Sequence, residues 1–383
     1  MADWITAEAA RERLGVRPQT LYAYVSRGRL RVRPDPEDPR RSLYRAADVA
    51  ALNERKARGR KAADVAAGAI AWGEPVLDSA ITTVVGGRLY YRGRDAVALS
   101  GTETLEGVAR LLRGGDGAAL KRTERPVPPQ AADMRARAFA ALAARAGQDP
   151  PARGRHPLAL AVEAATLLDV LADAVAGQVG GGAIHDRLAS AWGHHAAGRA
   201  SDLIRRALVL LADHELNAST FAARVAASTG ASLAASALAG LAALSGPRHG
   251  GATAAVRGLL AEAAEIGPAA AIAARLAEDR VIPGFGHQLY PEGDPRAEAL
   301  IDRLSLSSDL QDLRTAVLSH TGMAANVDFA LVALAETLEL PRDAPFALFA
   351  VARCAGWIAH AMEQGQTGQL IRPRARYTGP EPG

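Results

Sequence analysis

The chain has 383 residues, of which 49% are hydrophobic, 22% are charged and 4% are aromatic, and its formal net charge is +4. This composition excludes a chain that is disordered throughout and predicts a soluble protein with a sizeable core. The single cysteine, Cys354, excludes an internal disulfide framework, and no uninterrupted apolar run reaches the roughly 18 residues that a membrane span needs. We therefore expect a cytoplasmic protein with no membrane segment.

The charge is concentrated at the N-terminal end of the chain. Residues 1–61 contain 15 Lys and Arg against 8 Asp and Glu, which gives +7, so the other residues carry −3 of the total of +4. A basic end on a slightly acidic body predicts two parts with different partners.

Residues 1–61 are predicted to form a compact unit that begins with two short helices. Thr6 is the expected N-cap of the first helix and Gly15 its stop. Pro18 suits the first turn of the second helix, and Gly28 ends it. The apolar positions at helical spacing in these segments are Ile5, Ala9, Ala10, Leu14, Leu21, Tyr24 and Val25. Two short helices with a glycine turn between them predict a helix-turn-helix.

The rest of this unit is predicted to contain an extended loop followed by a third helix. The prolines of RVRPDPEDPRR (31–41) favour an extended loop, and residues 46–61 look helical again and end in a charged linker. Over residues 3–55 the unit resembles the winged helix-turn-helix modules of the MerR and excisionase kind. The pattern that carries the resemblance is Glu8-Ala9-Ala10, Leu14-Gly15-Val16, Thr20-Leu21, Tyr24, Gly28 and Leu30.

The resemblance implies that residues 1–61 bind DNA, with the second helix in the major groove and the wing on the backbone. The residues it places near DNA are Arg17, Gln19, Thr20, Tyr22, Arg27 and Arg29, with Arg31, Arg33, Arg40 and Arg41 on phosphates. The alternative is a helix-turn-helix kept as a structural or dimer-contact module, with its arginines in solvent.

From about residue 62 the sequence predicts a mainly α fold. Apolar residues recur at spacings of three and four, for example in 158–176, 203–211 and 233–244, and Ala and Leu dominate. The best β signal is a small hairpin, in which Ile81-Thr-Thr-Val-Val and Leu89-Tyr-Tyr flank two glycines. The glycine-rich segments 114–117 and 177–182 are expected to be loops.

Polar residues of the last 170 positions fall into four clusters. They are DHELNAST (213–220), SGPRHGG (245–251), PGFGH (283–287) followed by DPR (294–296), and NVD (326–328), with Arg353, Arg372 and Arg374 further on.

These clusters suggest carbon-acid chemistry on a substrate with several carboxylates. His249 lies in a turn between two helices, where a helix N-terminus favours the neutral imidazole, and His287 follows a Gly-x-Gly loop that lets backbone approach a ligand. Asp328 lies in an apolar helix, and burial raises the pKa of such a carboxyl, which makes it a usable base near neutral pH. Arginines that could each bind a carboxylate are Arg296, Arg353 and Arg372.

Each of these residues also has a purely structural interpretation. A histidine beside glycine is commonly a turn residue, an aspartate in a helix commonly pairs with an arginine, and an arginine in an alanine-rich helix can extend to solvent. No metal site is predicted, because His194 and His195 point in different directions on a helix and Cys354 is alone.

Taken together, the motifs resemble those of the citrate synthases, including the bacterial 2-methylcitrate synthases. The motifs are HELNAST, GPRHGG, PGFGH with the arginine of DPR nine residues after the histidine, NVD, a late RPRARYTG, and YYRGRDAVAL at 90–99. The resemblance runs from about 70 to 379. It implies an all-helical large domain formed by 62–250 plus 343–383 and a small helical domain formed by 251–342.

The resemblance also implies a role for each matching residue. His249 holds the enolate of the acyl thioester, Asp328 removes its proton, and His287 polarises the ketone of oxaloacetate. The implied oxaloacetate ligands are His214, Arg296 and Arg353. Arg372 is lent to the partner subunit, which implies a homodimer. The backbone implied to contact coenzyme A is that of Pro283, Gly284, Phe285 and Gly286. No cofactor is expected to stay bound, since the coenzyme A thioester is a substrate.

The expected activity is the condensation of acetyl-CoA or propionyl-CoA with oxaloacetate. One departure is the loop after His287, which carries Glu292 where many relatives have Arg or Lys. Together with the basic N-terminal unit, it motivates an alternative, in which the body senses a carboxylate or acyl-CoA and residues 1–61 bind DNA. A third interpretation, cleavage of citryl-CoA, uses the same groups as synthesis.

Overall fold

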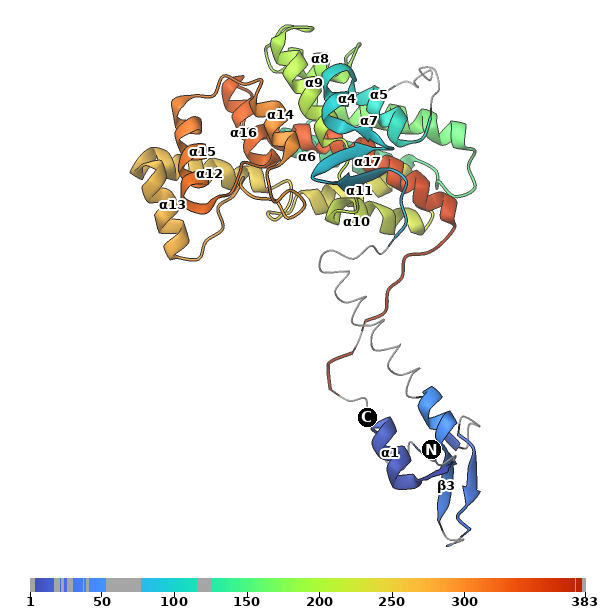
Figure 1. The fold of residues 1–383 in the computed structure, drawn as a ribbon. Coiled ribbons are helices and arrows are strands. Elements are labelled where there is room, and N and C mark those ends of the chain that lie inside the picture. The colour runs from blue at the N-terminus through green and yellow to red at the C-terminus, as the bar shows by residue number, and fades with distance from the viewer. Residues whose placement is uncertain are drawn as a thin grey trace. The chain divides into compact units, whose positions relative to one another are not determined.

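The computed structural model describes residues 4–16, 21, 24–25, 30–36, 38, 41–52, 77–115, 125–375 and 377–380. The chain divides into two compact units, Met1–Asp78 and Ser79–Gly383, which we call the N-terminal unit and the helical body (Figure 1). The predicted boundary at residue 61 lies outside the described residues. The further division of the helical body into a large and a small domain stays a prediction.

The N-terminal unit combines a small antiparallel sheet with helices. Its elements are β1 (Trp4–Thr6), α1 (Ala7–Leu14), β2 (Val32–Pro34) and β3 (Ser42–Arg45), and the strand order is β1-β3-β2. Its core consists of Ala10, Leu14, Leu21, Leu30, Tyr44 and Val49. Because this core is small, the sheet and the helices can only be stable by packing on one another.

The structure confirms some local predictions for this unit and corrects others. The hydroxyl of Thr6 accepts the Ala9 N–H, and Gly15 ends α1 with a left-handed φ of 58°. Ile5 lies in β1 and not on the face of α1, because it pairs with Tyr44 of β3. Pro34 lies in a strand and not in a loop, which is tolerated because β2 is an edge strand.

Other predictions for this unit are tested only in part. Of the predicted second helix, Leu21, Tyr24 and Val25 are described and are helical, and its other residues lie outside the described part. The later helical segment is described from Ala46 to Leu52.

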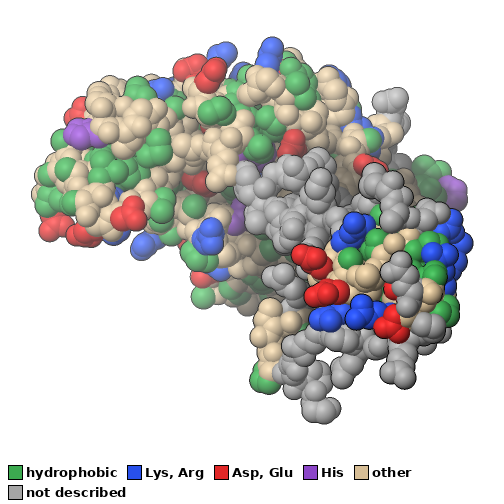
Figure 2. Space-filling model, turned by 60° about the horizontal axis from the view of Figure 1, so that its bottom comes forward, with side chains coloured by type: hydrophobic (Ala, Val, Ile, Leu, Met, Phe, Trp, Pro, Cys, Tyr) green, Lys and Arg blue, Asp and Glu red, His purple; other side chains and the backbone are tan. Residues whose placement is uncertain are grey.

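Three of the described arginines of the N-terminal unit, Arg31, Arg33 and Arg41, have partners within it. The guanidinium of Arg31 donates to both carboxylate oxygens of Asp48, at 2.9 and 2.8 Å. Arg41 pairs with Asp38 at 3.3 Å, and Arg33 lies 4.5 Å from the ring centre of Trp4. Figure 2 shows acidic and basic side chains interleaved on this unit. The other residues predicted to contact DNA, which are Arg17, Gln19, Thr20, Tyr22, Arg27, Arg29 and Arg40, lie outside the described residues.

The helical body consists of one small sheet and a series of helices. The strands are β4 (Thr82–Val85), β5 (Arg88–Tyr91) and β6 (Arg94–Asp95). The helices are α4 (Ala96–Thr102), α5 (Leu105–Leu112), α6 (Met134–Gln148), α7 (Pro157–Ala176), α8 (Ile184–Ala191), α9 (Arg199–Leu211), α10 (Ala218–Ser228), α11 (Leu233–Leu244), α12 (Ala252–Ile266), α13 (Pro268–Ala277), α14 (Pro295–Ile301), α15 (Ser308–Thr321), α16 (Val327–Thr337) and α17 (Ala344–Thr367). The body is therefore mainly helical, as predicted.

Helix α17 is the central element of the body. It packs against α5, α6, α7, α9, α10, α11 and α16, and its side chains are buried from Ala344 to Ala361 (Figure 1). Among the described helices, α17 alone is long and apolar enough to cross a membrane, but 94% of its apolar window is buried inside the protein. Its composition is therefore explained by its place in the core.

Helices α12, α13 and α15 pack on one another and gather at one side of the body, whereas α4, α5 and α8 lie at the other side (Figure 1). Three of the polar clusters identified in the sequence lie on segments between helices. Residues 212–217 lead into α10, 245–251 lead from α11 to α12, and 283–294 lead from α13 to α14.

The predicted hairpin of β4 and β5 is confirmed, and it holds the segment that precedes α10. Gly86 and Gly87 form its two-residue turn, both with left-handed φ, as that turn type requires. The Tyr91 hydroxyl lies 3.0 Å from the Val209 carbonyl oxygen, and the Thr82 hydroxyl donates to Asp213 Oδ2 at 2.5 Å. The hairpin therefore fixes the backbone from which the HELNAST cluster begins.

Gly356 of α17 allows this same segment to approach the central helix closely. Its backbone N–H donates to the Ala212 carbonyl at 3.1 Å. A Cβ at this position would lie 2.6 Å from that oxygen and would overlap the Asp213 carboxylate. Glycine is therefore required here by space and not by backbone conformation.

Gly356→Ala is expected to lower the free energy of unfolding by about 1–3 kcal/mol, because the added methyl group forces the segment away from α17. Gly365→Ala in the same helix is the matched control, since no atom lies within 4 Å of its added Cβ. The control should leave stability unchanged or raise it by up to about 1 kcal/mol. Chemical denaturation of both variants checks this, and equal stability of the two would refute the steric argument.

Candidate functional site

Two of the predicted histidines meet at a tyrosine. The ring centres of His214 and His287 are 5.3 Å apart in an edge-on arrangement, and Tyr290 lies 4.9 Å from His287 and 5.6 Å from His214. The Tyr290 hydroxyl is 2.9 Å from Nε2 of His214. Tyr290 was not predicted as a site residue. Its only sequence signal is its place three residues after His287.

The His287 ring is neutral, and its contacts show which of its two nitrogens carries the proton. Its Nδ1 accepts the Leu289 N–H at 3.1 Å, so the proton of the neutral ring is on Nε2. Burial, and then the charge of Arg296, lowers the pKa of His287 to about 4. Near neutral pH this side chain therefore offers an N–H donor without carrying a charge.

Arg296 is fully buried and is oriented by the residue that caps its own helix. Asp294 is the N-cap of α14, and its carboxylate accepts from Arg296 Nε at 2.9 Å and from Nη2 at 2.8 Å. The same carboxylate accepts the Val327 N–H at 3.1 Å. Asp294 therefore joins the start of α14 to the start of α16, where Asp328 lies.

His249 lies in the turn between α11 and α12, as predicted, and contacts Ser219. Its Nε2 is 2.8 Å from the Ser219 hydroxyl, which accepts the Trp357 indole N–H at 3.1 Å. Burial, and then the charge of Arg353, lowers the pKa of His249 to about 4. This ring is therefore also neutral near pH 7.

Asn217, next to Ser219 and His249, caps the N-terminus of α10 by accepting its free backbone N–H groups. Its Oδ1 accepts the N–H groups of Ser219 and Thr220 at 3.1 Å each and lies 2.7 Å from the Ser219 hydroxyl. The Ser219 hydroxyl donates its single proton to Asn217 Oδ1. If the hydroxyl turns towards His249 instead, Nε2 accepts that proton. In that arrangement the proton of the neutral His249 ring is on Nδ1.

Asp328 is half-buried at the second position of α16, and its Oδ1 is buried without a hydrogen-bond partner. Burial raises the pKa of Asp328 to about 6, against the opposing charge of Arg296. Asn326, the N-cap of α16, accepts the Asp328 N–H at 3.0 Å and donates through Nδ2 to the Gly286 carbonyl at 3.0 Å. Asn326 therefore links the carboxylate to the loop of His287.

Arg353 reaches the site from the middle of α17. Its Nε donates to the Leu211 carbonyl at 2.9 Å, and its guanidinium carbon is 4.9 Å from the ring centre of Phe349. The same ring is 5.7 Å from that of His249. Burial lowers the pKa of Arg353 to about 10, and the nearby charge of Asp213 opposes this. The guanidinium is thus a buried cation with donors left for a ligand.

The structure brings together six of the predicted site residues, which are His214, His249, His287, Arg296, Asp328 and Arg353. Their contacts and their effects on one another's pKa values connect them into one group. Arg372 is exposed, beyond the end of α17, and no hydrogen bond or ion pair among the described residues engages it. Arg372 therefore does not belong to this group of six within the chain itself.

The loop predicted to contact coenzyme A runs beside residues 324–326. Gly284 accepts the Asn326 N–H at 2.8 Å, and Gly286 donates to the Ala324 carbonyl at 2.8 Å. Phe285 is buried, with its ring centre 5.1 Å from that of Phe329. Of the four predicted residues, Pro283 and Gly286 are partly exposed, and Gly284 and Phe285 are buried.

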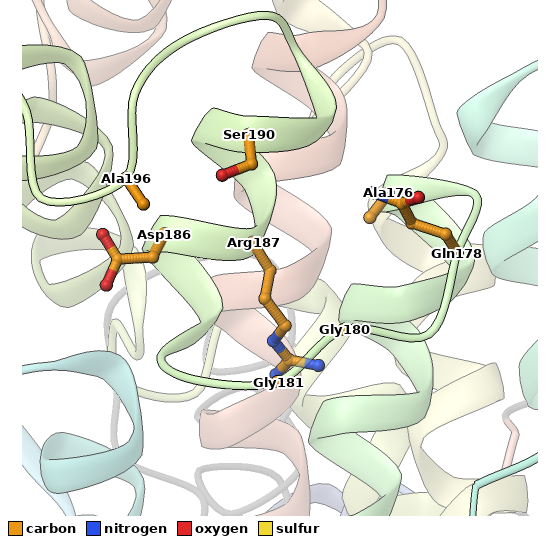
Figure 3. A pocket seen from close by; sticks show the side chains of 8 residues that line it. All are labelled: Ala176, Gln178, Gly180, Gly181, Asp186, Arg187, Ser190 and Ala196. Atoms are coloured by element: carbon orange, nitrogen blue, oxygen red, sulfur yellow. The ribbon is translucent and has the colours of Figure 1, made fainter.

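A separate hollow of about 180 Å³ lies where α7 ends and α8 begins. Figure 3 shows that Arg187 extends away from Ser190 along the loop of Gly180 and Gly181. Its guanidinium pairs with Asp169 and Asp173 of α7. Asp186, on the other side of the hollow, accepts from Ser201 at 2.6 Å. The charges that line this hollow are thus engaged by the protein itself. Among the described residues, no group of three or more His, Cys, Asp or Glu side chains is arranged to hold a metal ion.

Comparisons with known proteins agree with the geometry. A family profile described as the C-terminal domain of citrate synthase matches residues 118–374. Citrate synthase 2 of Bacillus subtilis is 40% identical over 194 residues, which cover 47% of this chain and 51% of that protein. A citrate synthase-like protein of Mycobacterium tuberculosis is 33% identical over 339 residues, which cover 78% of this chain and 88% of that protein.

The matched part of the chain thus spans about half the length of the Bacillus protein and most of the Mycobacterium protein. The solved citrate synthase of Thermotoga maritima aligns with a TM-score of 0.65 at 28% identity and covers 81% of this chain and 95% of that structure.

Asp328→Asn is expected to stabilise the protein at pH 8, because a carboxyl whose pKa is raised by folding destabilises the native state once it ionises. The gain should be up to about 3 kcal/mol at pH 8 and should vanish below about pH 4, where the carboxyl is protonated in both states. Asp309→Asn is the matched control, since Asp309 occupies the same position of α15 but is exposed. Denaturation at several pH values checks the prediction, and a stability difference that does not depend on pH would contradict it.

Proposed function

Because the chain belongs to the citrate synthase family, we propose that it condenses acetyl-CoA or propionyl-CoA with oxaloacetate to give citrate or 2-methylcitrate and free coenzyme A. The observation that carries the proposal is the meeting of neutral imidazoles and one carboxyl of raised pKa around two buried arginines. That combination can remove a proton from carbon, hold the resulting enolate and activate a ketone in one place.

Oxaloacetate would bind through its two carboxylates and its ketone. Arg353 and Arg296 supply buried guanidinium groups, and His214 supports Tyr290 beside them. The Nε2–H of His287 would donate to the ketone oxygen. A neutral donor suits this role, because it polarises the carbonyl without trapping a proton on the product oxygen.

Asp328 is proposed as the base that removes a proton from the methyl or methylene carbon next to the thioester. A thioester of this kind is a poor acid, so the base needs a donor at the oxygen where enolate charge develops. His249 can be that donor when the Ser219 hydroxyl gives its proton to Nε2, since the ring proton is then on Nδ1. This role requires the Ser219 hydroxyl to turn from Asn217 Oδ1 to His249 Nε2, which lies 2.8 Å away.

The enolate carbon would then attack the polarised ketone to form the new C–C bond, and the ketone oxygen would take a proton. Water would cleave the thioester of the resulting citryl-CoA and release coenzyme A. Because the same groups serve both directions, cleavage of citryl-CoA remains the alternative for this site.

The proposed active unit is a homodimer in which Arg372 acts in the partner's site. Its exposure in the single subunit supports this. Near His287, the loop carries the exposed Glu292 and no cation before Arg296, so arginines from elsewhere would contact the phosphates of coenzyme A.

The assay that tests the proposal is thiol release from acetyl-CoA or propionyl-CoA in the presence of oxaloacetate. Asp328→Ala should lower kcat by about 10²–10⁴-fold through loss of the base. For the unmodified chain, kcat/KM should fall tenfold per pH unit below about pH 6, since protonated Asp328 cannot accept a proton.

Asp309→Ala, on the exposed face of α15, controls for removal of a carboxylate near a helix start and should keep its activity. No thiol release above background from either thioester with the pure protein would sink the proposal.

We also propose that the N-terminal unit is a winged helix-turn-helix that binds DNA, which would make the chain a ligand-responsive regulator as well as, or instead of, an enzyme. The three-stranded sheet packed with α1 and the +7 charge of residues 1–61 support this proposal. The pairing of Arg31 with Asp48 and of Arg41 with Asp38 counts against strong phosphate contacts by these two residues.

Full-length protein titrated with labelled duplex DNA tests the second proposal. The affinity should fall on the order of 10–100-fold between 50 and 200 mM salt, because bound arginines displace counterions. Arg27→Ala together with Arg29→Ala should weaken binding and flatten the salt dependence. Absence of binding at 50 mM salt would leave the N-terminal unit with a structural role.

A further inference from the structure

A buried hydrogen-bonded chain lies behind the site and is not used by the proposed chemistry. It begins at Asp213, which precedes His214 in the sequence. Oδ2 of Asp213 is 3.1 Å from Nε2 of His360. The Nδ1 of His360 is 3.1 Å from Nη1 of Arg224. Because a guanidinium can only donate, Nδ1 accepts, and the proton of the neutral His360 ring is on Nε2 facing Asp213. The direction of both hydrogen bonds of His360 is therefore fixed.

Arg224 is the residue at which this chain meets the end of α17. It comes from α10, and only 1% of its surface is exposed. Its Nη1 donates to Glu363 Oε2 at 2.7 Å, and its Nε donates to Gln364 Oε1 at 3.0 Å. Glu363 in turn accepts the Ala80 N–H at 2.9 Å. Arg224 thus holds two consecutive side chains of the last turns of α17.

Gln364 connects Arg224 to the segment that follows the helix through hydrogen bonds. With its Oε1 held by Arg224, its Nε2 donates to Thr367 Oγ1 at 3.1 Å and to the Gln369 carbonyl at 3.0 Å. The Thr367 hydroxyl also accepts the Gln369 N–H at 3.2 Å. Both backbone groups of Gln369 are therefore held by side chains of α17. We call Gln364, Thr367 and Gln369 the tail clasp.

The clasp lies close in sequence to Arg372. Three extended residues span at most about 10 Å, so a fixed Gln369 confines the Arg372 backbone to a small region. Pro373 restricts this region further, because the residue before a proline is biased to an extended conformation. Of the two intervening residues, Leu370 is 58% exposed and Ile371 is half-buried, so the core contributes at most one side chain to holding this stretch.

We propose that Gln364 and Thr367, held by Arg224, are positioning residues that fix the exit of the C-terminal tail and so determine where Arg372 acts. The inference rests on the proposed role of Arg372 in the partner's site. It adds that residues with no contact to substrate control that arginine, through hydrogen bonds to the backbone of Gln369.

Gln364→Glu tests the clasp without unpairing the buried arginine. The carboxylate still accepts from Arg224 but can no longer donate to Thr367 or Gln369. Thr367→Val removes the other half of the clasp, and Thr367→Ser is the conservative variant that should restore it. Thr229→Val is the matched control, because Thr229 is an exposed threonine at the end of α10 whose hydroxyl donates to the carbonyl three residues back, as that of Thr367 does.

The first readout is the rate at which trypsin cleaves the native full-length chain after Arg374, followed by mass spectrometry. Gln364→Glu and Thr367→Val should raise this rate at least about 5-fold, because cleavage follows the population of the released tail. Thr367→Ser and Thr229→Val should cleave like the unmodified chain. Unchanged cleavage in both clasp variants would overturn the proposal without reference to activity.

The second readout is a double-mutant cycle on kcat/KM with Arg372→Ala. Gln364→Glu alone should lower kcat/KM by about 10–100-fold, as expected for a misplaced functional group. In the Arg372→Ala background it should have no further effect, since the residue it positions is gone. Effects that multiply would overturn the proposal, and so would full activity of Gln364→Glu beside a defective Arg372→Ala.

Two further outcomes separate this inference from the proposed function. If the unmodified chain shows no turnover, the proposed function fails, and the cleavage rates still decide whether the clasp holds the tail. If Arg372→Ala keeps full activity, the proposed role of Arg372 fails, and with it the claim that the clasp serves catalysis.

Discussion

The burial of Arg353 in the middle of α17 is the constraint on which the rest of the site depends. A guanidinium in a dry core is costly, and the helical body compensates for it with the Leu211 carbonyl, the Phe349 ring and the charge of Asp213. Burial and the positive charges of Arg353 and Arg296 disfavour protonation of the neighbouring histidines. They keep His249 and His287 neutral, and burial leaves Asp328 close to the point where it can exchange a proton. The same buried environment thus keeps two histidines neutral as N–H donors and raises the pKa of the carboxyl that can act as a base.

The scaffold holds these groups through a few polar contacts between distant segments. Asp294 joins α14 to α16, Asn326 joins α16 to the loop of His287, and the hairpin of β4 and β5 holds the segment before His214. Each of these contacts satisfies a backbone or carboxylate group of a buried or partly buried residue. The stability of the fold and the geometry of the site therefore depend on the same hydrogen bonds.

Sequence alone predicted much of the local structure and named most of the residues that the structure brings together. Glycine and threonine signals predicted the ends of α1, and Gly86-Gly87 predicted the hairpin, because turn and cap chemistry is local. Tyr290 was not predicted and Asp213 was given no role, since their importance comes from contacts between segments far apart in the chain. Ile5 and Pro34 were assigned to the wrong element because pairing with β3 outweighed their local preference.

His249 and His287 are neutral donors in a partly buried, positively charged site. The most direct test is NMR of the full-length chain with nitrogen-15 in its histidine rings, titrated with pH, with His249→Asn and His287→Asn variants to assign the signals. The account predicts that both rings stay neutral down to about pH 5, protonate near pH 4, and that His287 carries its proton on Nε2. Midpoints near 6.5, or a His287 ring with its proton on Nδ1, would contradict it.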